Sequence, residues 1–239
     1  MKLFDGAEAL ELQMQGFGGM QSIVHPLLLW GADGITLVDT GFPGQQPAIE
    51  EALGRHQLRL ADIDRIILTH QDVDHIGNLP GIVAAAQPVV LAHQADIPYI
   101  DGTLPLIKMQ GMAERMPEEM RERMRPLLEH PPAAPVDRAL TDGELLPLYG
   151  GIQVIHTPGH TPGHLCLYFP QEKVLIAGDA LRVVDGQLEG PAPQATPDMP
   201  LALQSLRKLP TDVERILCYH GGLFGPGAHR RLSEILESA

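Results

Sequence analysis

The sequence predicts an α/β fold in which two sheets pack face to face, with helices on the outer faces. Two observations support this. Short apolar segments typical of strands occur in both halves of the chain, and segments with helical spacing follow the strands in each half. Two sheets can bury their apolar faces against each other, and helices then cover the faces that remain. We expect a single domain over residues 1–239, with a helical insert at about residues 101–135.

The individual elements follow from apolar periodicity and from turn residues. Strands are expected at Ser22–Trp30, Gly34–Asp39, Asp64–Leu68, Pro88–Ala92, Ile152–His156, Leu165–Phe169, Val174–Ala177 and Arg215–Tyr219. Helices are expected at Pro47–Gln57, Leu79–Ala86, Met199–Leu209 and Gly227–Leu236. The chain therefore has two β-rich halves joined by the insert.

Methionines mark the insert. They recur every three or four residues, which puts them on one helical face, at Met109, Met112, Met116, Met120 and Met124. Pro117 interrupts the pattern, so the helix should break or restart there. Three interpretations remain open for this face. Ordinary core packing or a homodimer contact is favoured, and the alternative is an apolar wall that covers a substrate site.

Composition excludes several classes of function. The net charge of −13 disfavours nucleic-acid binding, because the basic residues of the insert alternate with glutamates. The chain has no apolar run near the ~18 residues needed to span a membrane, and its N-terminus does not resemble a secretory signal. We expect a cytoplasmic protein that acts on a small molecule, with Cys166 and Cys218 buried and reduced.

Ligand-type side chains gather where predicted strands end. The segment Thr69–His75 reads THQDVDH, so it places His70, Asp72, Asp74 and His75 directly after an apolar strand. Imidazole and carboxylate groups are the usual protein ligands of zinc, manganese and iron. A loop at a strand end can aim several such groups at one point. This segment predicts a metal site.

Three further strand ends carry the same kind of residue. The segment 156–164 reads HTPGHTPGH, in which proline and glycine hold His160 in a rigid loop. The pair Gly178-Asp179 ends the VLIA strand, and His220 follows the strand that ends in LCY. Packing alone does not explain four strand ends of this kind in one chain.

Taken together, these motifs resemble those of the metallo-β-lactamase superfamily. That family has a T-H-x-H-x-D-H segment, a later histidine in a P-G-H-T-P-G-like loop, a G-D pair and a final histidine. All four occur here in order and across nearly the whole chain, with a deviation at one ligand position only. The resemblance implies a four-layer αββα sandwich with the metals at the strand ends.

The resemblance also implies the role of each residue. His70, Asp72 and His160 would hold one metal ion, while Asp74, His75 and His220 would hold a second. Asp179 would bridge the two ions together with a water or hydroxide, and Asp74 would orient that nucleophile. The catalytic residues implied are therefore Asp74 and Asp179. His156 and His164 lie near the motif, where a supporting role and simple packing are both open.

Asp72 departs from the family pattern, which has histidine at this position. A carboxylate is a harder ligand than imidazole, so Asp72 leaves the identity of the metal open. We expect two divalent ions, with zinc favoured and manganese or iron as alternatives.

The implied activity is hydrolysis of an ester, thioester or lactone by the bridging hydroxide. Lactonases of the family carry a tyrosine three residues after the bridging aspartate. Arg182 stands there in this chain, which disfavours that assignment. The alternative is an iron-dependent oxygenase or oxidoreductase of the same fold, such as a persulfide dioxygenase.

Overall fold

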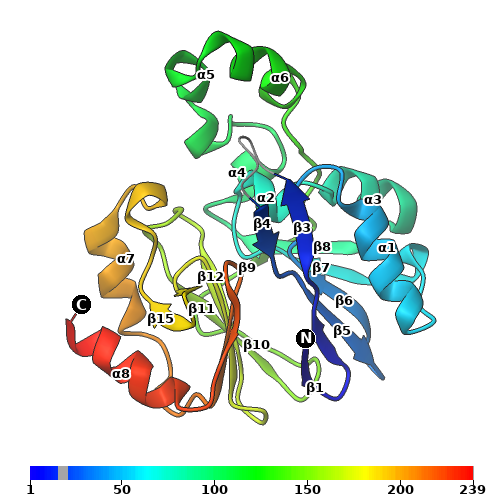
Figure 1. Ribbon diagram of the computed structural model, residues 1–239. Helices are drawn as coiled ribbons and strands as arrows, with labels where there is room; N and C mark the ends of the chain where they lie inside the picture. The colour runs from blue at the N-terminus through cyan, green and yellow to red at the C-terminus, as the bar shows by residue number, and fades with distance from the viewer. Residues whose placement is uncertain (16–20, 239) are drawn as a thin grey trace.

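The computed structural model describes residues 1–15 and 21–238, and the chain forms four layers within that part. Two sheets lie at the centre (Figure 1). Helices α1 (Gln46–Arg55) and α3 (Leu79–Ala86) cover one outer face, and α7 (Met199–Leu206) and α8 (Ala228–Ser238) cover the other. The predicted αββα sandwich is confirmed.

The first sheet belongs to the N-terminal half. Its strands run in the order β1-β2-β5-β6-β7-β8-β9. Their bounds are β1 Lys2–Phe4, β2 Ala7–Ala9, β5 Leu27–Gly31, β6 Gly34–Val38, β7 Arg65–Ile67, β8 Val89–His93 and β9 Arg138–Leu140. Strands β6 to β9 are mutually parallel, so their carboxyl ends meet at one edge. Helix α2 (Val73–Ile76) and helix α4 (Ile97–Ile100) begin beyond that edge.

The second sheet belongs to the C-terminal half. Its order is β10-β11-β12-β13-β16-β17. The bounds are β10 Leu145–Leu146, β11 Ile152–His156, β12 Leu165–Phe169, β13 Val174–Gly178, β16 Arg215–Cys218 and β17 Gly222–Phe224. Two hairpins stand outside the sheets, formed by β3 (Leu12–Gln15) with β4 (Gln21–Val24) and by β14 (Arg182–Val184) with β15 (Gln187–Glu189).

Alternation along the strands divides the core into three parts. In β5, Leu27 and Leu29 pack between the two sheets, whereas Leu28 packs under α1 and α3. In β12, Leu167 faces the first sheet, whereas Cys166 packs toward α7 and α8. Successive side chains of a strand point to opposite faces, so strands buried on both sides read as continuous apolar runs.

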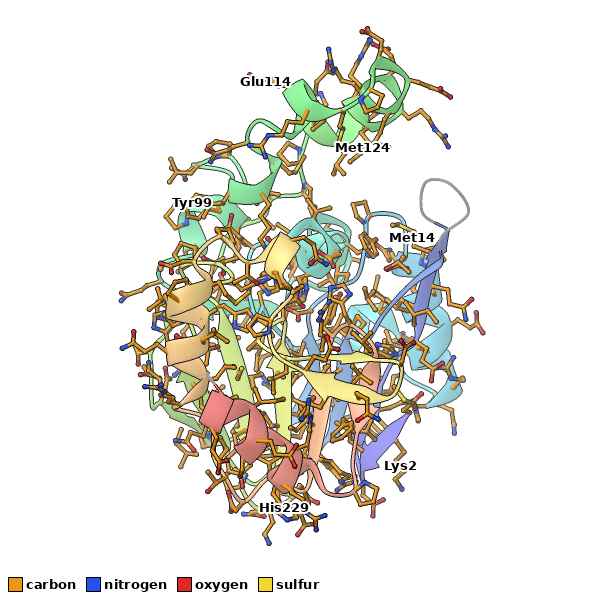
Figure 2. All side chains as sticks on the ribbon, turned by 60° about the vertical axis from the view of Figure 1, so that its left-hand side comes forward. Lys2, Met14, Tyr99, Glu114, Met124 and His229 are labelled. Atoms are coloured by element: carbon orange, nitrogen blue, oxygen red, sulfur yellow. The ribbon has the colours of Figure 1, made fainter. Side chains whose placement is uncertain are left out.

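The insert stands at one end of the molecule. It contains the 3₁₀ turn Ile107–Met109, helix α5 (Met112–Arg115) and helix α6 (Glu118–Glu129), whose N-cap is Pro117. Figure 2 shows Glu114 and Met124 on this part, apart from the body of the fold. No residue of α6 is buried, so its methionines do not form part of a closed core within the described chain.

Several elements differ from the sequence-based expectation. The segment predicted as one strand at Ser22–Trp30 is two strands, because His25 and Pro26 separate β4 from β5 and lead them into different sheets. The sequence pattern does not predict the short strands β1 to β3, β9, β10 and β17 or the β14–β15 hairpin, since two to four residues carry little periodicity. None of the described helices is long and apolar enough to cross a membrane.

Candidate metal centre

The seven side chains predicted as ligands lie together at the carboxyl ends of strands from both sheets. They form two groups within which the ligand atoms lie no more than 4.8 Å apart. The first group is His70, Asp72, His160 and Asp179, and the second is Asp74, His75 and His220. The parallel pairs β6–β7 and β13–β16 bring these strand ends to the same edge.

Asp72 lies at the centre of the first group. Its Oδ2 is 3.2 Å from His70 Nε2 and 3.0 Å from His160 Nε2. His160 Nε2 is also 3.2 Å from Asp179 Oδ2. Ring and carboxylate atoms from three separate loops therefore point at one small volume.

The second group is arranged around Asp74 and is linked to the first by Asp179. Asp74 Oδ2 is 3.2 Å from His220 Nε2 and 3.8 Å from His75 Nε2. Asp179 reaches this group through both oxygens, with Oδ1 3.3 Å from His75 Nε2 and Oδ2 3.4 Å from His220 Nε2. Asp179 is thus the member that touches both groups.

Asp39, which directly follows β6, orients the segment Thr69–His75. Its carboxylate accepts hydrogen bonds from the backbone N–H of Thr69 at 2.8 Å and the Thr69 hydroxyl at 2.7 Å. Its Oδ2 also lies 2.9 Å from His75 Nδ1. Because a carboxylate can only accept, Nδ1 of His75 carries a proton, which leaves Nε2 as the ring nitrogen that faces the cluster and could bind a metal.

His164 supports Asp179 from behind. The backbone N–H of Asp179 donates to His164 Nε2 at 3.0 Å, so that nitrogen is unprotonated. The Nδ1 of His164 then donates to the Thr157 hydroxyl at 2.8 Å. Burial, with His70 and His160 nearby, holds the pKa of His164 well below its ordinary value, which keeps the ring neutral. The supporting role left open for His164 agrees with this contact, whereas His156 stacks on His93.

A buried carboxylate, Asp96, ties two of the ligand loops together. It accepts hydrogen bonds from the backbone N–H of Gln71 at 3.0 Å and of Gly163 at 2.7 Å, and from the Thr161 hydroxyl at 2.7 Å. These donors flank His70 on one loop and His160 on the other. Asp96 therefore fixes how the two loops meet.

Tyr219 packs beneath the second group. Its ring stacks on His75 with centroids 3.7 Å apart, and its hydroxyl donates to the backbone carbonyl of Asp74. The same hydroxyl accepts from the N–H of Gly41 at 3.2 Å. Tyr219 directly precedes His220 in the sequence. These two adjacent residues therefore supply a ligand-type ring, that of His220, and the ring that packs under His75.

The chemistry of the cluster fits metal ions. His70 Nε2, His75 Nε2 and Asp179 Oδ1 are buried and make no hydrogen bond to any described residue. Buried polar atoms without partners are costly, so such atoms facing one another indicate a site built for a cation. An ammonium group, that of Lys108, already lies against Asp72 and His160. Nitrogen and carboxylate oxygen donors of this kind suit zinc, manganese or iron.

The charges of the two groups are complementary. Burial opposes ionisation of Asp179, but His75, His220 and hydrogen bonds from His160 hold its pKa well below the ordinary value. Burial also opposes protonation of His220, yet Asp179 and Asp74 raise the pKa of that ring from 6.5 to about 10. A metal ion that bound at this centre would therefore have to displace protons from histidine.

Sequence reasoning found the ligand-type residues but missed those that hold them. Asp39 carried a usable signal, since it is a carboxylate at the end of a predicted strand. Tyr219 likewise ends a predicted strand, directly before His220. Asp96 and Lys108 carried no signal, because each reaches the cluster through a contact between segments far apart in the sequence.

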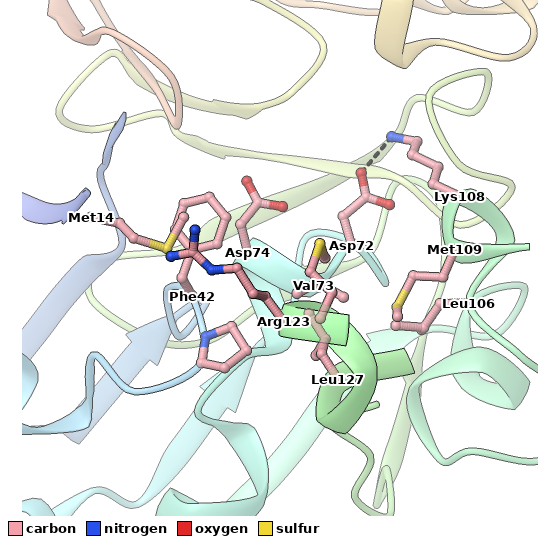
Figure 3. Close-up of a pocket in the computed structure, with 12 residues that line it drawn as sticks. Met14, Phe42, Asp72, Val73, Asp74, Leu106, Lys108, Met109, Arg123 and Leu127 are labelled. Carbon is pink, nitrogen blue, oxygen red and sulfur yellow. Dashed lines mark hydrogen bonds and ion pairs between the residues drawn. The ribbon is translucent and has the colours of Figure 1, made fainter. Parts of the chain in front are cut away.

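A cavity of about 410 Å³ opens beside the cluster, between the body of the fold and the insert. Asp72 and Asp74 form its polar side (Figure 3). Its other lining is mostly apolar and comes from Met14, Phe42, Pro43, Val73, Leu106, Met109, Met124 and Leu127, with Lys108 and Arg123. The insert thus faces the cluster across this cavity.

Comparison with known proteins gives consistent matches. The family model described as metallo-beta-lactamase superfamily matches residues 21–221. The probable metallo-hydrolase YflN of Bacillus subtilis is 30% identical over 202 residues, which are 77% of this chain and 74% of that protein. A hydroxyacylglutathione hydrolase of Rhizobium johnstonii is 43% identical over 81 residues only, 32% of this chain and 30% of that protein.

Solved structures agree. The crystal structure of a metallo-beta-lactamase family protein from Thermus thermophilus matches with a TM-score of 0.74 and 27% identity. The match covers 99% of this chain and 80% of that one.

Proposed function

Because the chain belongs to the metallo-β-lactamase superfamily, we propose that it is a hydrolase that uses two divalent metal ions to cleave an ester, thioester or lactone. One observation carries the proposal. Two groups of ligand-type side chains lie at the polar side of a cavity large enough for a small-molecule substrate, and Asp179 of the first group also reaches His75 and His220 of the second.

The ligand assignment follows the two groups. His70, Asp72 and His160 would hold the first ion. Asp74, His75 and His220 would hold the second, with Asp179 between them. When bound, such ions supply a nucleophile from water at neutral pH and polarise a substrate carbonyl.

Residues around the proposed metal positions would orient the ligand side chains and the attacking water. Asp39 and Asp96 fix the loops, so that the Nε2 atoms of His75 and His160 point inward without rearrangement. Asp74 lines the cavity and its carboxylate is held by His220 at 3.2 Å, so it is placed to accept a proton from the attacking water and orient it. Preorganised groups of this kind need not move during the reaction.

The apolar lining supports a substrate with an apolar acyl group. The reacting carbonyl would lie at the Asp72–Asp74 side, and the acyl chain would lie along Met109, Met124 and Leu127. Methionine side chains adapt to varied apolar shapes, so this wall tolerates a range of acyl groups. This proposal adopts the interpretation in which the methionine face covers a substrate site. A homodimer contact through the solvent-facing surface of α6 is a separate proposal.

A second candidate rests on Asp72. A carboxylate in the first group favours a harder metal than an all-imidazole set does, so an iron-dependent oxygenase of the same fold remains a proposal. Oxygen consumption with a persulfide substrate would support it, and hydrolysis without oxygen would contradict it.

The test is metal analysis of the purified protein, followed by a screen of p-nitrophenyl esters, acyl thioesters and lactones of graded chain length. Two ions per chain and a rate that rises with acyl length are expected. No bound metal after reconstitution of the folded protein would overturn the proposal. A rate indifferent to acyl length would overturn the substrate class alone.

A further inference from the structure

Lys108 places its ammonium group inside the first ligand group. The residue lies on the 3₁₀ turn of the insert, and its Nζ contacts Asp72 Oδ2 and lies 2.5 Å from His160 Nε2. Figure 3 shows the side chain reaching from the insert to Asp72. Both contacted atoms are ligand atoms of the first position. The ammonium therefore occupies the place that the first metal ion would take.

We infer that Lys108 competes with metal for the first position, so that the two positions fill unequally and the second fills first. The inference rests on the ligand assignment of the proposed function. Lys108 and a divalent ion cannot both contact Asp72 Oδ2 beside His160, because both are positive and both need the lone pairs of that carboxylate oxygen.

The turn that carries Lys108 is fixed to the loop that carries Asp72. The backbone N–H of Ile107 donates to Gln71 Oε1 at 2.9 Å, and Leu106 is buried to 4% exposure. Met109 packs against the core beneath α1 and α3. The backbone thus holds Lys108 within reach of the cluster, and its 22%-exposed side chain can withdraw into the cavity by rotation about its own bonds.

The competition is selective for one position. Both contacts of Lys108 are with members of the first group. Asp74, His75 and His220 instead approach one another and Asp179. An ion entering there does not have to displace the lysine.

The contact between Lys108 and Asp72 also gives a reason for a carboxylate at position 72. A neutral imidazole at this position would offer the ammonium no formal charge. A carboxylate binds either cation, and hydrogen bonds to charged groups are stronger than neutral ones. Asp72 and Lys108 therefore act as a pair in which the lysine holds the carboxylate until metal arrives.

The experiment is titration of metal-free, full-length protein with Co²⁺ against a chelator of known affinity, followed by the visible d–d bands. Wild type should bind two ions with dissociation constants at least about tenfold apart. Lys108→Met should tighten the weaker step by about tenfold or more, the equivalent of one charge-assisted contact, and leave the stronger step unchanged. Lys108→Arg keeps the charge and should keep the weak step weak.

Control variants distinguish competition by Lys108 from the effect of removing any positive charge from the protein. Lys2→Met removes an equal charge from a 70%-exposed side chain at the far end of the molecule and should change neither step (Figure 2). His160→Ala should abolish the weaker step and His220→Ala the stronger one. Lys108→Gln provides a second variant if Lys108→Met does not fold.

Two outcomes overturn the inference alone. These are equal affinities in wild type, and a weaker step that neither Lys108→Met nor Lys108→Gln tightens. Failure of every form to bind cobalt would overturn the proposed function, and the competition with it.

Discussion

The candidate metal centre and the insert that faces it differ in how they are held. His70 and His75 are fully buried, and polar contacts from Asp39 and Asp96 fix their loops. Helix α6 buries none of its residues and presents Met124 to the cavity. The first arrangement favours one geometry, which chemistry requires, whereas an exposed apolar wall can adjust to its ligand. We therefore expect catalysis and substrate choice to be carried by different parts of the molecule.

The largest expected effect tests whether Asp179 holds the centre together. Asp179→Ala removes the group that touches both ligand sets, so both ions should bind more weakly. The loss of kcat/KM should exceed the roughly 10- to 100-fold typical of mutations outside the ligand shell. Metal content and esterase kinetics measure it. Glu51→Ala, which removes an exposed carboxylate from α1, should have no effect. A variant that retained both ions and full activity would show that Asp179 is not the bridge.

The second prediction concerns Asp39, whose carboxylate contacts the ligand-type residue His75. Asp39→Asn keeps the size of the side chain and tolerates the positive φ of 61° at this position. An amide facing His75 Nδ1 can donate, which favours the ring tautomer whose Nε2 is protonated and cannot bind metal. Metal affinity should fall roughly 10- to 100-fold.

Asp137→Asn is the matched control for Asp39→Asn. The Asp137 carboxylate likewise accepts a backbone N–H, that of Val90 at 2.8 Å, but takes no part in the cluster. Equal losses of metal affinity in both variants would show that Asp39 supports the fold rather than the tautomer of His75.

The sequence predicts the ligand-type residues of the centre, but it does not predict the contact that the insert makes with them. His70 to His75 and His160 lie on short segments after apolar strands, so local pattern locates them and the parallel strand ends bring them together. Lys108 lies 36 residues from Asp72 in a methionine-rich segment, and nothing local shows that it reaches the centre. Contacts of that kind depend on how the insert folds back, which periodicity does not encode.

Acid–base behaviour provides a test of the centre without metal. Asp179 and Asp74 raise the pKa of His220 to about 10 against the opposing effect of burial. A raised pKa in the folded state stabilises the protein below the unfolded value of 6.5, and this stabilisation is lost as pH rises toward 10. In chelator, the melting temperature should therefore fall modestly between about pH 6.5 and 10, because the His220 side chain is 38% exposed.

His220→Gln should flatten that decline without removing it, because the pKa values of His75 and His160 are raised as well. Thermal melts at several pH values measure the effect. With metal bound the histidines are deprotonated ligands, so the decline should be smaller in the loaded protein. A melting temperature that rose over this interval in chelator would contradict the assigned charges.

The smallest expected effect concerns the insert, and it is the one that most directly tests the division of roles. Met124→Ser removes apolar surface from the cavity wall on an exposed helix, so stability should change by less than about 0.5 kcal/mol. For a long-chain acyl ester, KM should rise several-fold, since each buried methylene contributes about 0.8 kcal/mol, while kcat stays near that of the wild type. Met120→Ser is the matched control, because Met120 lies on the same helix but outside the cavity lining.

A short-chain ester, which does not reach Met124, should be hydrolysed equally by the wild type, Met124→Ser and Met120→Ser. A large fall in melting temperature for Met124→Ser would identify the methionine face as packing instead, and equal KM values for long and short esters would remove the insert from substrate recognition.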